Sequence, residues 1–111
     1  MALLTASSVT QSASNVAPAA IGTSNTISAG DIGTRGCLLN VINGAAASVD
    51  VTLVDPGRTP AGNAGLVSAQ AVANGTDRWF RLGPALVDPA TGVATVTVSA
   101  AASVTYKLIR L

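Results

Sequence analysis

The feature that most constrains the fold is the shortness of the apolar runs and the turn residues that separate them. Residues 48–54 show the cleanest alternation, with Val49, Val51 and Leu53 on one face of an extended strand and three polar side chains on the other, Ser48, Asp50 and Thr52. Six further runs of similar length follow the same pattern, and Gly, Pro, Asn or Asp lies in every gap but the last; the runs span residues 23–28, 37–43, 66–72, 76–82, 93–99 and 104–111. This pattern predicts an all-β chain, a single small β-sandwich or barrel of about seven short antiparallel strands.

Turn chemistry refines this prediction. Asn43-Gly44 and Asn74-Gly75 each stand between two strand runs, and both are interpreted as hairpin turns. Residues 55–63 hold two Pro and two Gly and predict a loop. Residues 66–73 contain Ala, so a short helical turn is the alternative to a strand there. The glycines at 30, 33 and 36 match no phosphate-binding spacing and are interpreted as turn residues.

The predicted core is thin because aromatic residues make up only 3% of the 111 residues. Val and Ala bury less apolar area than Leu or Phe, so such a domain should be only marginally stable alone. Association with other subunits would supply the missing burial. The residues expected inside are Cys37, Leu39, Val41, Val49, Val51, Leu53, Val67, Phe80, Leu82, Val96, Val98, Tyr106 and Leu108.

The first 21 residues differ from the rest. Met1 to Ile21 carries no charge and keeps neither a helical nor a strand period. It therefore predicts an extended N-terminal arm (residues 1–21) followed by a β-domain (residues 22–111). Leu3, Leu4, Val9 and Val16 make this arm more apolar than a solvated tail requires. Two interpretations stay open, a disordered arm or an arm that orders against a neighbouring subunit.

Several functional classes fail on composition. The chain has no His and no Glu, so neither a His-based triad nor the usual zinc site can be built. Of the five Asp residues, three lie in Gly/Pro turns. We therefore expect no enzyme, no cofactor and no metal. A net charge of +1 with a single Lys offers no field for nucleic acid. The sequence contains no run of about 20 apolar residues, so no membrane span is predicted, and no signal peptide is visible.

The remaining features point to assembly. Charged residues make up only 10% of the chain, which favours a surface covered by other subunits, including copies of the same chain. Arg78-Trp79-Phe80-Arg81 is the densest cluster of interaction-prone residues. In a strand, Trp79 and Arg81 would lie opposite Phe80, so Trp79 is either a core residue of a second face or a partner contact. A single stacking aromatic is weak support for nucleic-acid binding. Cys37 is the single cysteine, so no internal disulfide can form. It is interpreted as a buried thiol, with an intermolecular disulfide or a reactive thiol as the alternative.

The candidate subunit contacts are therefore drawn from the arm and from this cluster. They are Leu3, Leu4, Val9, Val16, Arg78, Trp79 and Arg81.

An all-β, His-free, charge-poor chain of this length with an uncharged N-terminal arm resembles the small capsid decoration (cement) proteins of tailed bacteriophages. The stretches LVDPGRTPAGNAG and LGPALVDPATGVATVTVSAAASVTYKLIRL carry this likeness. It covers the whole chain but rests on composition and layout, so it transfers no functional residue. The resemblance implies a host-made protein on the capsid exterior, often a trimer, that bridges neighbouring subunits of the major capsid protein. Its arm would add a strand to a neighbour's sheet.

Two other functions are alternatives for this chain. A neck, tail or tail-tip component of the virion would share this composition. A small β-sandwich module that binds cell-surface glycan is the second alternative, although three aromatic residues in all are few for sugar stacking.

Overall fold

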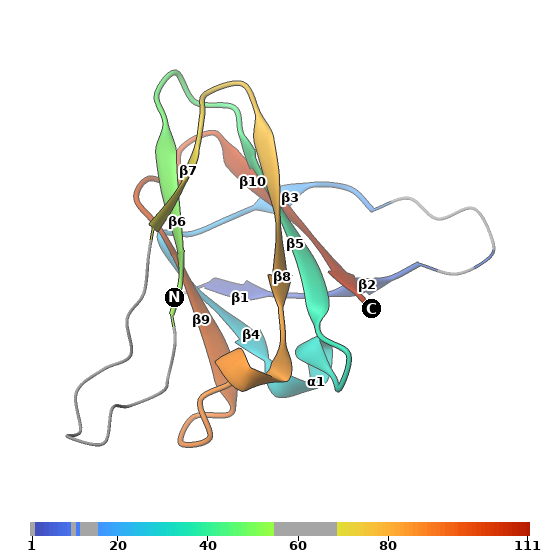
Figure 1. Cartoon of the computed structure of the whole chain (residues 1–111). Helices are drawn as coiled ribbons and strands as arrows, with labels where there is room; N and C mark the ends of the chain where they lie inside the picture. Colours follow the sequence, from blue (N-terminus) through green and yellow to red (C-terminus); the bar gives the residue numbers. More distant parts are fainter. Residues whose placement is uncertain (1, 10, 12–15, 55–68) are drawn as a thin grey trace.

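The computed structural model describes residues 2–9, 11, 16–54 and 69–111, and it folds them into two mixed β-sheets. Figure 1 shows the sheets as the two layers of a sandwich. Sheet A has the strand order β1 (Ala2–Leu4), β4 (Ser24–Ser28), β9 (Val93–Val98), β6 (Val49–Leu53) and β7 (Ala69–Val72). Sheet B has the order β2 (Ser7–Ser8), β10 (Val104–Arg110), β5 (Cys37–Asn43) and β8 (Asp77–Leu82), and β3 (Ala19–Ala20) also pairs with β10.

The all-β prediction is confirmed, and each of the seven predicted strands has a counterpart, β4 to β10. These seven pair with one another only in the antiparallel sense. The strand expected at 66–72 is described from residue 69 onward, where it is extended and not helical. Helical structure in the described residues is limited to one turn, α1 (Ala29–Ile32), and the 3-10 turn η1 (Pro84–Leu86).

The core lies between the sheets and follows the two-residue period of the strands. In β9 and β10, alternate residues are buried, and the side chains between them are partly exposed. Most of the predicted core is confirmed, while Leu53 and Phe80 are only half-buried and Val67 lies outside the described residues. The core also holds residues that were not predicted: Leu4, Ile21, Ile27, Ile32, Val72, Ala94 and Val104.

The hairpin predicted at Asn43-Gly44 is wrong. Strand β5 belongs to sheet B and β6 to sheet A, so this corner carries the chain from one sheet to the other. Asn43 is buried, and its side-chain amide donates to the carbonyl oxygens of Ala47 and Val72, both at 2.9 Å. Gly44 has an ordinary φ, but a Cβ there would come within 2.9 Å of the Ser103 carbonyl oxygen. Asn43 and Gly44 therefore allow the chain to pack closely where it passes from β5 to β6.

The hairpin predicted at Asn74-Gly75 is wrong for the same reason, because β7 and β8 lie in different sheets. The two corners lie side by side at the top of Figure 1. The Gly75 N–H donates to the Asn43 carbonyl oxygen, and the Asn43 N–H donates to the Thr76 carbonyl oxygen, each at 2.9 Å. Two residues of one strand thus face one residue of the other, which is a β-bulge at the start of β8.

Of the three glycines predicted as turn residues at the base of the sandwich, Gly33 and Gly36 have the positive φ that glycine favours, whereas Gly30 lies inside α1. Gly36 has φ +86°, and a Cβ at this position would collide with the Leu82 carbonyl oxygen. The chain needs glycine here to pass from α1 into β5 against the end of β8.

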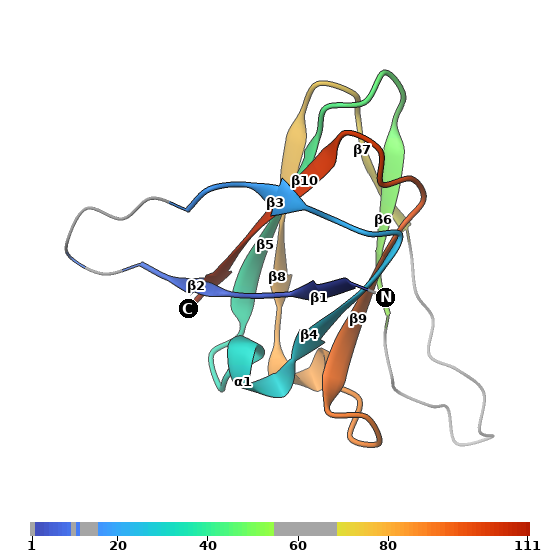
Figure 2. The same ribbon diagram turned by 180° about the vertical axis from the view of Figure 1, so that it is seen from behind.

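The N-terminal segment pairs with both sheets instead of extending away from the β-domain. Strand β1 runs parallel to β4 at the edge of sheet A, and β2 runs parallel to β10 at the edge of sheet B. Figure 2 shows this stretch crossing the sandwich from one sheet to the other. Strand β3 then pairs with the same edge of β10, opposite Thr105 and Tyr106. One side of the sandwich is therefore closed by β1, β2 and β3.

Candidate functional site

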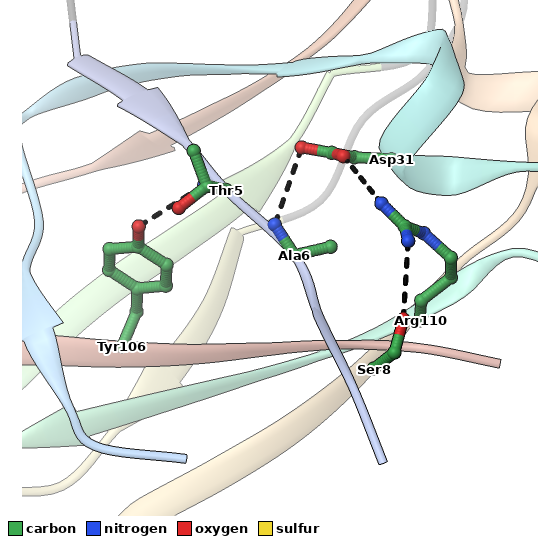
Figure 3. A network of polar contacts seen from close by, with 6 residues as sticks. All are labelled: Thr5, Ala6, Ser8, Asp31, Tyr106 and Arg110. Carbon is green, nitrogen blue, oxygen red and sulfur yellow. Dashed lines mark hydrogen bonds and ion pairs between the residues drawn. The ribbon is translucent and has the colours of Figure 1, made fainter. Parts of the chain in front are cut away.

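A polar network fixes the N-terminal segment to the sandwich (Figure 3). The backbone N–H of Thr5 donates to the Tyr106 hydroxyl at 3.3 Å, and the N–H of Ala6 donates to Oδ2 of Asp31 at 3.3 Å. Arg110 joins the two parts: its guanidinium lies 2.8 Å from Oδ1 of Asp31 and 3.2 Å from the Ser8 hydroxyl. Asp31 lies in α1, the turn that follows β4. This turn therefore holds the segment between β1 and β2 in place.

The structure divides the four arm residues predicted as subunit contacts. Leu4 is fully buried in the core of its own chain, because the alternation of β1 turns it inward, and its prediction as a subunit contact is wrong for this fold. Leu3 and Val9 are exposed, at 62% and 55% of their surfaces. Val16 is half-buried. Of these four arm residues, only Leu3 and Val9 thus expose a large apolar side chain to solvent.

Trp79 and Arg81 lie on the outer face of sheet B, as the alternation of residues 78–82 predicts. Trp79 is 52% exposed, so it is not a core residue of a second face. Arg78 is exposed too, but the strand period points it to the opposite side, and its guanidinium donates to the Asp77 carbonyl oxygen at 2.8 Å. Arg81 donates to the carbonyl oxygen of Arg35 at 3.3 Å.

The register of sheet B assembles a surface around Trp79 that we call the β8 face. Asn40 lies beside Trp79, and Lys107 lies beside Asn40 on the far side. One row further along, Leu38 lies between Arg81 and Ile109. Cross-strand partners share a face of the sheet, so the β8 face joins an exposed indole, half-buried aliphatic side chains and two cations; its residues are Leu38, Asn40, Ile42, Asp77, Trp79, Arg81, Lys107 and Ile109.

Asn40 shows how this face is ordered. It is only 3% exposed although it points outward, and its cross-strand neighbours on this face are Trp79 and Lys107. Its amide donates to Oδ2 of Asp77 at 2.8 Å and to the Arg78 carbonyl oxygen at 3.3 Å. The amide thereby fixes the Asp77 carboxylate at the edge of β8.

Sequence reasoning missed the contribution of β5 and β10 to this face. The alternation of 104–111 already separates Lys107 and Ile109 from the core residues of that strand. What it cannot give is the strand order that brings them beside Trp79.

Leu3 and Trp79 lie on opposite sides of the molecule. Leu3 pairs with Thr26 on the outer face of sheet A, whereas Trp79 belongs to the outer face of sheet B. The predicted contacts therefore form two separate surfaces.

Cys37 is buried at the start of β5, as predicted. Its pKa is raised above the ordinary value of 9.0, first by burial and second by the negative charge of Asp31, while Arg110 acts in the opposite direction. The thiol is therefore held in its protonated form, which is the less reactive one.

Within the described residues, no cluster of three or more His, Cys, Asp or Glu side chains could hold a metal ion. No helix in the same part of the chain is long and apolar enough to cross a membrane.

Comparison with known proteins gave no match to a family model, to a curated protein or to a solved structure.

Proposed function

We propose that this chain is a non-enzymatic virion structural protein, a capsid decoration protein that binds the outer shell and bridges neighbouring capsid subunits. It would be made in the host cytoplasm and reside on the capsid exterior. The observation that carries the proposal is the pair of exposed apolar residues on opposite faces of one small sandwich, Leu3 at 62% and Trp79 at 52%. A bridging protein needs two separate contact surfaces.

The sparse charge of the chain supports the same function. With 10% charged residues and a net charge of +1, the electrostatic repulsion between this chain and other proteins is weak. Contacts that are individually weak become strong on a shell, because symmetry repeats them and the chain binds at two points.

The first test is quantitative peptide mass spectrometry on purified particles, reporting copies of this chain per major shell protein. A simple ratio corresponding to hundreds of copies supports capsid decoration. A few to a few dozen copies would move the protein to the neck or tail. Its absence from particles would overturn the virion proposal.

The second test separates the two surfaces. Leu3→Ser and Trp79→Ala are each expected to retain weak attachment to shells but to lose the gain in particle heat resistance, because each leaves one contact. Leu111→Ala, which shortens an apolar side chain that is 46% exposed at the other end of the chain, is the control. If Trp79→Ala leaves shell binding intact and abolishes glycan binding, the protein is a glycan-binding module instead.

A further inference from the structure

The side of the sandwich opposite the N-terminal segment carries an open strand edge. Strand β8 is the last strand of sheet B, and among the described strands it pairs only with β5. The other edge of this sheet differs, because β2 and β3 both pair along β10. Within the part of the chain that the structure describes, no backbone hydrogen bond joins the outer edge of β8 to another segment.

Two backbone hydrogen bonds at the end of β5 show which N–H and C=O groups of β8 point away from β5. The Asn43 N–H donates to Thr76, on the β8 side of β5, and the Gly44 N–H donates to Ser103, on the β10 side. Antiparallel ladders alternate at every residue, so β5 uses residues 37, 39, 41 and 43 toward β8. Their partners on β8 are 78, 80 and 82. The N–H and C=O groups of Asp77, Trp79 and Arg81 therefore face the open side.

We propose that β8 pairs with β8 of a second copy of this chain, antiparallel and centred on Trp79. A two-fold axis at Trp79 sets residue 77 of one copy opposite residue 81 of the other. The three outward-facing residues of each copy then exchange all their free N–H and C=O groups. The two copies of sheet B become one continuous sheet, and the isologous contact closes as a dimer.

Charge complementarity selects this partner and this register. Asp77 of each copy comes to lie opposite Arg81 of the other, so the dimer gains two cross-strand pairs of opposite charge. Shifting the register by two residues either way sets Asp77 or Arg81 opposite Trp79 and loses both pairs. Asn40 already orients the Asp77 carboxylate through Oδ2, which leaves Oδ1 for the incoming guanidinium.

The remaining side chains fit the same arrangement. Trp79 would lie beside its symmetry mate on the outer face, where each indole is 52% exposed in the monomer. On the other face, Arg78 would lie opposite Phe80, which is half-buried, and a guanidinium packs well on an aromatic ring. Pairing requires Arg78 to release the Asp77 carbonyl oxygen that it now contacts.

Strand β8 has two of the devices that protect an edge, the bulge at Gly75-Thr76 before its first residue and the inward-pointing Arg78, but it lacks others. Its six residues, Asp-Arg-Trp-Phe-Arg-Leu, contain neither Pro nor Lys. An edge of this length with an exposed Trp at its centre is suited to strand pairing. This inference goes beyond the proposed function, and it replaces the trimer that the resemblance implies with a two-fold dimer.

The test is the oligomeric state of the purified chain, measured by sedimentation equilibrium, combined with a charge exchange. The wild type is expected to form dimers. Asp77→Arg and Arg81→Asp should each weaken dimerisation by about tenfold, because two attractive pairs become repulsive. The double variant carrying both changes restores opposite charges and should recover most of the affinity. Asp50→Arg, which makes the same charge change as Asp77→Arg at an exposed position of β6 in the other sheet, is the matched control and should leave the dimer intact.

A covalent trap tests the register itself. In a Cys37→Ala background, Trp79→Cys should form an intermolecular disulfide under mild oxidation, because directly opposed residues of a strand pair come within disulfide reach. Gln70→Cys, on the exposed edge strand β7, should cross-link much less. A wild type that stays monomeric at high micromolar concentration would overturn the proposal. So would a trimer, or a dimer that neither charge variant weakens.

Discussion

The corner at Asn43 offers the sharpest test of how this fold is held together. The side chain is 1% exposed and makes three hydrogen bonds of 2.9 Å: two donated by its amide, to Ala47 and Val72, and one accepted from the Ala45 N–H. Asn43→Ala removes all three. At a net contribution of roughly 1 kcal/mol each, the free energy of unfolding should fall by about 3 kcal/mol.

Urea unfolding followed by circular dichroism measures this loss, and the melting temperature should fall by roughly 12 °C. Asn74→Ala is the matched control, since Asn74 lies in the adjacent corner and is exposed. We expect the control to cost less than about 0.5 kcal/mol. A loss below about 1 kcal/mol for Asn43→Ala, or equal losses for the two variants, would refute the view that a side-chain amide holds the sheet-to-sheet corner.

Three further predictions concern the N-terminal segment and the thiol. Leu4→Ala should destabilise the protein by about 3 kcal/mol, whereas Leu3→Ala should cost less than about 0.5 kcal/mol, because only Leu4 is buried; thermal melts of the two variants decide this. Asp31→Asn should cost about 1 kcal/mol and speed proteolysis of the N-terminal segment, since it removes the ion pair to the partly exposed Arg110; unchanged proteolysis would contradict the role assigned to Asp31. The raised pKa of Cys37 means that the unfolded thiol loses its proton at a lower pH than the folded one, so this contribution to stability is complete below pH 9.0 and is lost as the pH rises through the folded pKa. Urea midpoints measured from pH 8 upward should therefore fall more steeply for the wild type than for Cys37→Ala.

The seven-strand pattern and most of the core could be predicted because they depend on local information. Alternation in residues 49–53 and 93–98 states which side chains turn inward, whatever the strands pair with. The same argument separated Trp79 from Leu82. The exposed part of the candidate site was therefore available from the sequence.

The corners and the N-terminal segment could not be predicted in the same way. Asn-Gly permits a tight hairpin, but here the stabilisation comes from partners far along the chain, such as Val72 and Ser103. Similarly, nothing within residues 2–8 indicates a strand, because β1 and β2 gain their hydrogen bonds only from β4 and β10. Leu4 is buried because that pairing turns it into the core.

The sequence by itself determined the all-β fold class, the inward and outward faces of each strand and the absence of any site built on His or Glu. Those properties depend on residue type and on a two-residue period. The tertiary structure alone decided which strands are neighbours, and so which edge is closed by the N-terminal segment and which edge leaves Asp77, Trp79 and Arg81 open. Strand order depends on long-range burial and hydrogen bonding summed over the whole domain, and no local stretch of residues carries that sum.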